Sequence, residues 1–250
     1  MTLKFSYKGI AIAIGIISIW FGAMIFVLKA NIAIITLLPA LIVLILLYTG
    51  LFITAHDAMH GTIAPKHPRI NAFIGVCCVL LYALFSFKKL RKQHRLHHAN
   101  PAAENDPDYH DGNHTGFWLW YLNFLLRYVT IYQVISMAIA FNILHHVFEI
   151  ALERLLVFWV LPSLLSTLQL FYFGTYLPHR KPDGGYDNRH RARSNNYPSW
   201  LSFLTCYHFG YHWEHHEQPN VPWWLLPTLR DHYLKKFKPS YHRQSIQRTN

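Results

Sequence analysis

The chain has 250 residues, of which 52% are hydrophobic and 14% are charged, and its formal net charge is +11. A net positive charge of this size can indicate nucleic-acid binding, but here the basic residues do not belong to a soluble basic domain. Two uncharged runs, 11–28 and 32–54, are each long enough for a helix that crosses a bilayer, which takes roughly 20 residues. The composition therefore argues against nucleic acid as a partner and favours an integral membrane protein.

The apolar runs in the first third of the chain predict a transmembrane hairpin followed by a shorter element. Runs 11–28 and 32–54 would cross the membrane and return. The next run, 72–87, has sixteen residues, which is short for a span. If it crossed, histidines that we expect to share one site would end on opposite faces. We therefore expect it to lie in the interface or to enter the membrane and return.

Runs 117–144 and 155–178 predict a second hairpin. Arg127 interrupts the first of them, which costs roughly 2.5–3.5 kcal/mol at a helix centre, so its side chain should snorkel or face the bundle. Pro162 in the other is tolerable in a membrane helix. The polar segment 100–116 should lie in water or fold over the site. The sequence thus predicts an all-α, four-transmembrane-helix bundle with a cytoplasmic helical cap that carries a histidine-rich site.

The basic residues predict the orientation of this bundle. If both termini are cytoplasmic, twenty of the twenty-three lysines and arginines fall on the cytoplasmic side, as the positive-inside rule requires. Only Lys29 and Arg154 fall outside, and one arginine lies within a span. Asp111 and Asn250 should then face the cytoplasm and Glu153 the opposite side. The same orientation places every histidine cluster on the cytoplasmic side.

Eight histidines form three clusters whose members are mostly three or four residues apart, so that each cluster can share one helical face. Imidazole nitrogen suits first-row transition metals. Eight imidazoles are too many for one four-coordinate zinc ion, whereas eight or more could serve two iron ions that each take five or six ligands. The sequence therefore predicts a di-iron centre. The clusters are His56 and His60; His94, His97 and His98; and His212, His215 and His216.

Two further histidines are candidate ligands. His179 ends the last predicted span on the side of the clusters, so it can complete the site from a fourth direction. His208 precedes His212 by four residues and is either a ligand or a group just outside the ligands. His145 and His146 lie at the other membrane face in this topology, so we do not expect them to be ligands.

Carboxylates near the clusters are candidate supporting groups, because a metal-bound histidine usually donates its second N–H to a carboxylate or carbonyl. Those close enough in sequence are Asp57, Asp106, Asp108 and Glu214. The remaining histidines lack ligand spacing and are expected to be solvated: His67, His110, His114, His190, His232 and His242.

These motifs resemble the membrane fatty-acid desaturase and hydroxylase superfamily, whose signature is three histidine boxes at the cytoplasmic ends of a four-helix bundle. Within it, the segments around the boxes and the Leu-Pro-His-Arg at 177–180 are similar to the bacterial and cyanobacterial β-carotene 4-ketolases. The string 222–227, Pro-Trp-Trp-Leu-Leu-Pro, adds to that likeness. The resemblance runs from about 51 to 230, as the core of a single membrane domain over 1–250.

The resemblance implies an O2-dependent enzyme that introduces ketones at the ring 4-positions of β-carotene, giving echinenone and canthaxanthin. The cofactors would be two Fe2+ ions, with O2 as co-substrate. No Gly-x-Gly-x-x-Gly motif and no haem-ligating cysteine pattern occurs, so an external donor must supply electrons. Basic residues near the site would suit an acidic ferredoxin, and the lipophilic carotenoid would enter from membrane lipid.

Two alternatives remain open at the level of sequence. A lipid desaturase or carotenoid hydroxylase of the same superfamily would share the iron pair and differ in substrate. A membrane metal transporter would belong to a different class, but transport favours ligands along a path through the spans, and no histidine lies in the middle of a predicted span. Formation of an O2-dependent product would separate an enzyme from a transporter.

Overall fold

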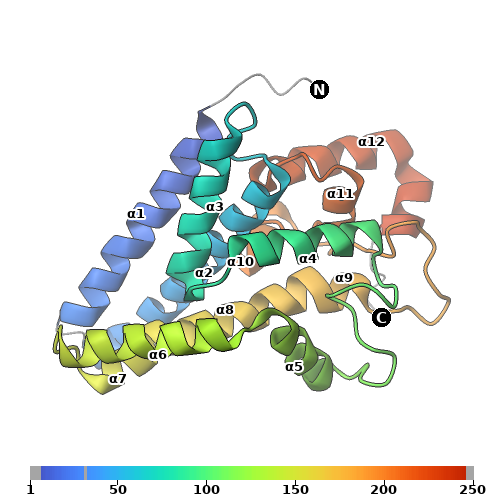
Figure 1. Ribbon diagram of the computed structural model, residues 1–250. Coiled ribbons are helices and arrows are strands. Elements are labelled where there is room, and N and C mark those ends of the chain that lie inside the picture. Colours follow the sequence, from blue (N-terminus) through green and yellow to red (C-terminus); the bar gives the residue numbers. More distant parts are fainter. Residues whose placement is uncertain (1–6, 31–32, 246–250) are drawn as a thin grey trace. The chain divides into compact units, whose positions relative to one another are not determined.

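A computed structural model describes residues 7–30 and 33–245 of the chain (Figure 1). Over these residues the structure consists of helices and connecting loops, with no β-strand. The all-α prediction is therefore confirmed for the described part of the chain. Ile32 and Asn250, which the sequence predictions use, fall outside these residues, and the side chain of His242 also lies outside the described part of the structure.

The chain divides into two compact units, each built from two separate stretches of sequence. The first unit comprises Met1–Phe87 and Val129–Leu168, and the second comprises Lys88–Tyr128 and Gln169–Asn250. The sequence predicts a single membrane domain over 1–250, and the division into two units does not test that prediction. The first unit holds α1 (Lys8–Lys29), α2 (Ile34–His60), α3 (Pro68–Ala83), α6 (Ile131–His146), α7 (Leu152–Leu155), the π-helix η1 (Leu156–Val160) and most of α8 (Leu161–Phe171). The second holds α4 (Phe87–Ala99), α5 (Phe117–Tyr128), the π-helix η2 (Tyr172–Tyr176), α9 (Leu177–His179), α10 (Ser199–Cys206), α11 (His212–Glu217), the 3-10 helix η3 (Trp223–Leu225) and α12 (Leu226–Ser245).

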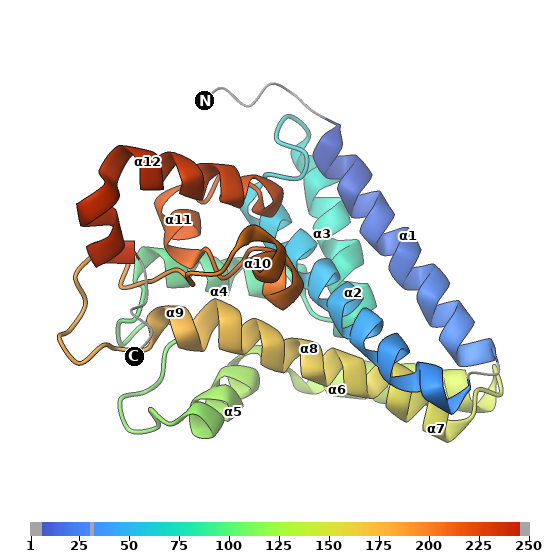
Figure 2. The same cartoon turned by 180° about the vertical axis from the view of Figure 1, so that it is seen from behind.

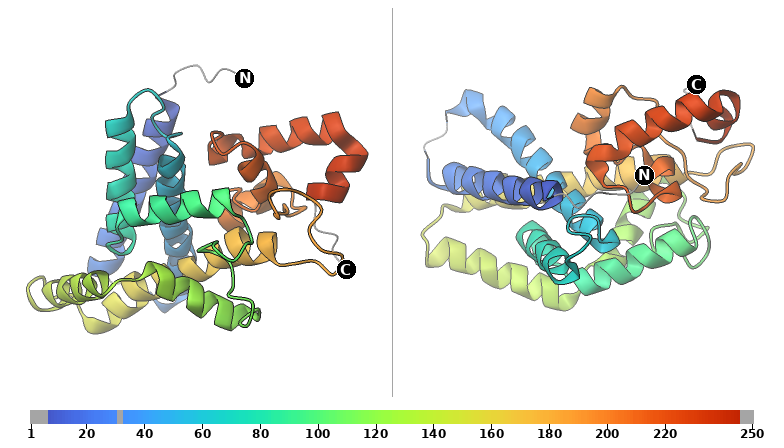
Figure 3. Two further views of the ribbon diagram at one scale, coloured as in Figure 1. Left: turned by 45° about the vertical axis from the view of Figure 1, so that its right-hand side comes forward. Right: turned by 90° about the horizontal axis from the view of Figure 1, so that it is seen from above.

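In the first unit, α1, α2 and α3 pack side by side, as Figures 1, 2 and 3 show from different directions. Their shared interior is aromatic. The ring of Tyr48 lies 5.5 Å from Trp20 and 5.7 Å from Tyr82, both at nearly right angles, which is the favourable edge-to-face geometry. Phe21 and Phe26 on α1 are exposed. Large apolar side chains on the outside of a helix are typical of contact with lipid.

Hydroxyl groups join the helices inside this apolar unit. The Tyr82 hydroxyl donates to the Ser166 oxygen at 3.1 Å, and the Thr49 and Ser166 hydroxyls lie 2.9 Å apart. These side chains belong to α3, α8 and α2, and all three are buried. A polar group in an apolar interior must find its partner within the protein, so the three hydroxyls fix how these helices pack.

Three helical stretches among the described residues are long and apolar enough to cross a membrane: Lys8–Lys29, Ile35–His60 and Leu152–His179. They confirm the helices expected at 11–28, 32–54 and 155–178. The continuous helix expected over 117–144 is wrong, because α5 ends at Tyr128 and α6 begins at Ile131. Thr130 accepts a hydrogen bond from the Gln133 N–H at 3.2 Å and so caps the start of α6. Counting each bent pair, α3 with α4 and α5 with α6, as one span would raise the number of spans to five.

The stretch Leu152–His179 contains two π-helical segments, η1 and η2. A π-helical turn holds more residues than an α-helical turn, and such turns are frequent at functional sites. The segment η2 ends at Tyr176, and α9 carries His179 immediately beyond it. The π-helical turn therefore helps to set the direction in which the His179 side chain points.

The second unit contains the amphipathic helix α4. Its buried residues, Phe87, Leu90, His94 and His97, recur every three or four positions and so form one face. A long loop joins α9 to α10, and Figure 3 shows it running out from the ends of both helices. Helix α11 packs against α12, where the Trp213 ring lies 5.2 Å from that of Tyr233. This packing presents the histidines of α11 to those of α4 within one compact unit.

Candidate metal centre

Four buried histidines of the second unit converge on one point, and we call them the inner group. They are His97 on α4, His179 on α9, and His212 and His216 on α11. One ring nitrogen from each lies within 4.8 Å of the others. The Nε2 atoms of His179 and His212 are 2.9 Å apart, and those of His97 and His216 are 3.1 Å apart. Three helices that are distant in sequence therefore aim four imidazoles at a common centre.

The outward hydrogen bonds of the inner group define which nitrogen faces the centre. The Nδ1–H of His179 donates to the Arg191 carbonyl at 2.9 Å, so Nε2 carries the lone pair. The Nδ1 of His97 bonds to the Asp106 carboxylate at 2.9 Å, which likewise leaves Nε2 as the inward atom. Nitrogen lone pairs about 3 Å apart repel one another unless a cation lies between them. The donor set fits a first-row transition metal.

Burial also keeps this group in the form that binds metal. Burial, with the neighbouring rings of His98 and His212, lowers the pKa of His216 well below its ordinary value. The His216 imidazole is therefore neutral at physiological pH. A ligating histidine must be neutral, so no proton has to be displaced from His216 before a metal binds.

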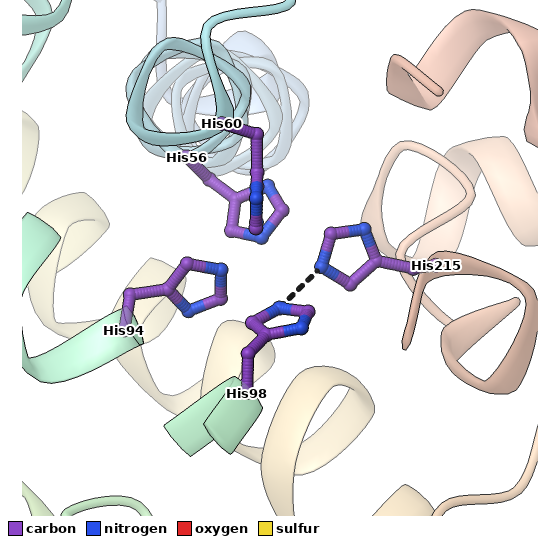
Figure 4. Close-up of side chains that lie close together, drawn as sticks. All are labelled: His56, His60, His94, His98 and His215. Atoms are coloured by element: carbon purple, nitrogen blue, oxygen red, sulfur yellow. Dashed lines mark hydrogen bonds between the residues drawn. The ribbon is translucent and has the colours of Figure 1, made fainter. Parts of the chain in front are cut away.

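Three more histidines of the second unit form an outer group, which is drawn in Figure 4. It consists of His94 and His98 on α4 and His215 on α11, and their ligand atoms lie within 4.8 Å of one another. The Nε2 atoms of His98 and His215 are 2.9 Å apart. Because α4 and α11 each supply both groups, two neighbouring ligand sets come from the same pair of helices.

His56 and His60 form a pair at the end of α2 in the first unit. They are one helical turn apart, their ring centroids are 5.0 Å apart, and both rings point the same way from the helix (Figure 4). Asp57 lies 3.3 Å from the Nδ1 atom of His56. Gly61, with a φ of 80°, ends the helix directly after the pair, in a left-handed conformation that glycine adopts without strain. The sequence expectation of one shared face is confirmed for this pair.

Asp106 is the carboxylate that orients the inner group. It bonds to His97, and it accepts the backbone N–H groups of Ala102 at 2.7 Å and Asp108 at 2.9 Å. Burial raises the pKa of Asp106, but the nearby His97 outweighs burial, so the pKa lies below its usual value. The group is therefore a carboxylate at neutral pH. The prediction that Asp106 supports a cluster histidine agrees with this contact.

Arg127 holds the loop that carries Asp106. Its guanidinium donates to the carbonyls of Asp106 at 3.1 Å, Pro107 at 3.0 Å and Tyr109 at 2.8 Å. Asp108 of the same loop accepts the Tyr128 hydroxyl and lies 3.8 Å from the Nδ1 atom of His97. The loop 100–116 is therefore folded against α5 at this point, and Arg127 is satisfied by backbone carbonyls.

Glu214 lies on α11 between the histidines, and its side chain is fully buried. It accepts a hydrogen bond from Arg230 on α12 at 2.8 Å and another from the Ser194 hydroxyl. The Arg230 guanidinium also lies 4.6 Å from the centre of the Tyr211 ring. These contacts anchor α11 to α12 and to the preceding loop, a role that sequence spacing did not reveal for Arg230 or Ser194.

His208 is not a member of either group. Its ring lies parallel to Tyr211 with centroids 5.7 Å apart, and its backbone φ is 62°. Burial lowers the pKa of His208 to about 4. His190, expected to be solvated, is half-buried instead: its Nε2–H donates to Glu217 at 2.7 Å, and its ring lies 5.8 Å from His216. That expectation was wrong because the fold of the 180–198 loop, which spacing does not indicate, returns His190 to α11.

The sequence matches the fatty acid desaturase family over residues 32–141 and 130–247. The chain belongs to this family of membrane proteins, as the histidine motifs indicated.

Three relatives make the comparison more specific. A "Beta-carotene ketolase" of Haematococcus lacustris is 43% identical over 76% of this chain and 60% of its own length. A "Beta-carotene ketolase" of a Paracoccus species is 43% identical over 74% of this chain and 75% of its own. A "Zeaxanthin 4-ketolase" of Chlamydomonas reinhardtii is 42% identical over 74% of this chain and 42% of its own. The matched part of the chain thus spans between 42% and 75% of the length of these relatives.

Proposed function

We propose that this protein is a carotenoid ketolase, which converts the ring C4 methylenes of β-carotene to ketones. The observation that carries the proposal is a pair of all-imidazole ligand groups, the inner one fully buried, in a chain 43% identical to β-carotene ketolases over about three quarters of its length. The lipid desaturase and carotenoid hydroxylase alternatives are less favoured, since the relatives described above are named ketolases. The transporter alternative lacks support, because the ligand groups gather at helix ends.

We propose two iron ions as the cofactor. The inner group would hold one through His97, His179, His212 and His216. The outer group would hold the other, with His56 and His60 of the first unit completing its ligand set of His94, His98 and His215. Support comes from the ligand atoms of the second unit, which lie within 4.8 Å of one another in each group. His208 stays outside both sets.

Bound iron would supply the redox chemistry that activates O2. The protein's own part is to hold and shield the reacting centre. Asp106 and the Arg191 carbonyl hold the Nδ1 protons of His97 and His179, so the inward lone pairs stay available. The buried side chains around the groups exclude bulk water, which would compete with the substrate. Positioning and exclusion of water are the contributions expected of a protein around a reactive cofactor.

The reaction balances as two hydroxylations at one carbon. Each takes one O2, two electrons and two protons, and each inserts one oxygen atom into a C–H bond and releases one water. The ring methylene is allylic to the polyene, which weakens its C–H bonds. The product of the second step is a gem-diol, and loss of one water from it gives the ketone. An external donor must deliver four electrons per ketone, and we propose a ferredoxin-type protein.

We propose that both termini and the metal centre face the cytoplasm and that the carotenoid enters from the lipid. Support comes from the basic bias of the sequence and from exposed basic residues on α4, which suit anionic headgroups or an acidic donor: Lys88, Lys92 and Arg95. Single cysteines at Asp111 and Asn250 should react with an impermeant reagent from the cytoplasmic side, and one at Glu153 only from the other. Labelling of Asp111 and Asn250 from opposite sides would contradict this topology.

The proposed activity is tested by expressing the chain in cells that make β-carotene and separating the pigments by chromatography. We expect echinenone and canthaxanthin under aeration and neither without O2. A parallel culture that makes zeaxanthin would show whether a hydroxylated ring is also accepted. Cells that accumulate the protein in their membranes and form no keto-carotenoid from either pigment would contradict the proposal.

A further inference from the structure

Gly174 in the π-helix η2 is packed so tightly that no side chain fits. A Cβ atom there would lie 2.3 Å from Cε1 and 2.5 Å from Cδ1 of the Phe209 ring. Ordinary van der Waals contact begins near 3.4 Å. Glycine inside a helix costs about 1 kcal/mol relative to alanine, so this position needs another reason for it. The reason is the Phe209 ring, which occupies the space of the missing Cβ.

The same Phe209 ring lies beside both groups of ligands. Its centroid is 5.0 Å from that of His212 in the inner group and 5.6 Å from that of His215 in the outer group. Phe209 itself is buried. A ring displaced by a bulkier residue at position 174 therefore has histidines of both groups among its immediate neighbours. Protein interiors are close-packed, so such a displacement is passed on to the neighbours.

The two chain segments that meet at Gly174 and Phe209 meet again at the ligands. His179 follows Gly174 by five residues through η2 and α9, and His212 follows Phe209 by three. The Nε2 atoms of these two histidines are 2.9 Å apart. The two segments are therefore in contact at two places, at Gly174 with Phe209 and, a few residues further along each segment, at His179 with His212.

We propose that Phe209 is a positioning residue for the metal centre. Gly174 is needed because, having no side chain, it leaves the space that the Phe209 ring occupies. The ring sets the spacing between the helix that carries His179 and the helix that carries His212 and His215. This inference rests on the proposed iron centre. It assigns no contact with the substrate to Phe209.

The test is Gly174→Ala in the full-length protein, purified from membranes in detergent and assayed for iron per chain. Helix propensity alone predicts that alanine stabilises the helix and leaves the iron content unchanged. The steric argument predicts the opposite result for the metal, a loss of at least half of the iron. Gly22→Ala in α1 is the matched control, because a Cβ there has no atom within 4 Å, and it should keep full iron.

Rescue separates positioning from a general packing defect. Phe209→Leu alone should lower the iron content, because the ring that sets the spacing is lost. In the double variant Gly174→Ala with Phe209→Leu the new methyl group takes up part of the vacated space, so iron content should be higher than in either single variant. Cobalt absorption spectra should then show ligand geometry closer to wild type in the double variant than in Gly174→Ala. If Gly174→Ala alone fails to accumulate, accumulation of the double variant with metal bound gives the same support.

Two results would overturn the inference. One is full iron content and an unchanged cobalt spectrum in Gly174→Ala. The other is a double variant no better than Gly174→Ala, because the cause would then lie in the backbone of η2. Wild-type protein that holds iron but makes no ketone would overturn the proposed activity alone, since the positioning test is read from metal binding. Wild-type protein that binds no metal would overturn both.

Discussion

The inner and outer groups of histidines differ in where their ligands come from. All four members of the inner group are buried and belong to the second unit. The Nδ1 atom of His97 bonds to Asp106, and that of His179 bonds to the Arg191 carbonyl. The outer group has three members in that unit. Under our proposal it takes two more, His56 and His60, from the first unit. The ligands of the inner group thus come from one compact unit, whereas the outer site, as we propose it, would draw its ligands from both.

The largest expected effect comes from removing an inner ligand. His179→Ala should abolish ketone formation in β-carotene-producing cells and lower the iron content, because three imidazoles leave that ion incompletely held. His145→Ala is the matched control: it lies in the first unit, where its Nδ1–H donates to the Ile150 carbonyl. It should leave most of the activity. Equal ketone yields from both variants, at equal protein levels in the membrane, would show that His179 is misassigned.

The second effect tests the contribution of the first unit. His60→Ala should lower iron from about two ions per chain to about one, because only the outer site loses a ligand. Metal analysis of the purified protein measures this directly. His67→Ala, an exposed histidine just beyond the same helix, should keep both ions. Two tightly held ions in the His60 variant would mean that α2 does not complete the outer site.

A smaller effect is expected at the carboxylate behind the inner group. Asp106→Asn keeps the size of the side chain but weakens its bond to His97, and such changes typically cost about 10- to 100-fold in metal affinity or activity. Metal competition titrations would measure the affinity. Asp111→Asn, in the same loop but bonded to the exposed His114, is the control and should be neutral. An Asp106 variant with wild-type affinity would contradict the orienting role.

The smallest effect concerns pH and His208. Its folded-state pKa is lowered to about 4, so below pH 6.5 the unfolded chain takes up a proton that the folded chain does not. Stability should therefore fall as the pH drops from about 6.5 towards 4. His208→Phe should show a shallower fall in thermal midpoint over this range than wild type. His232→Phe, at an exposed position, should not, and an unchanged slope in the His208 variant would refute the assignment.

Much of the site followed from spacing, because residues three or four apart on a helix must share a face. That rule alone groups His94 with His98, and His212 with His216. It did not show that each cluster divides, so that His97 and His215 lie in the other ligand group from their neighbours. It could not reveal partners that come from distant loops, such as the Arg191 carbonyl behind His179 or Arg230 beside Glu214. Backbone carbonyls and long-range ion pairs leave no periodic signal in a sequence.

The break between α5 and α6 shows a similar limit for the fold. Apolar composition continues through 117–144, so a hydropathy argument joins the two helices. The structure instead uses Thr130 as a cap, a local hydrogen bond that average apolarity does not record. Arg127 next to this break has its guanidinium bonded to the loop that carries Asp106. The charge that looked costly within a span is accommodated where the helix ends.

The interleaving of the two units along the chain has a consequence for biosynthesis. The histidines of the second unit are not all present until α11 has been made, about 120 residues after His94 is synthesised. At about 5–20 residues per second, roughly 6 to 24 s separate the first and last ligands that belong to the second unit. Metal loading must therefore follow insertion of most of the chain into the membrane. Nascent chains stalled before His212 should retain no iron, so the cell must deliver the metal to an already inserted protein.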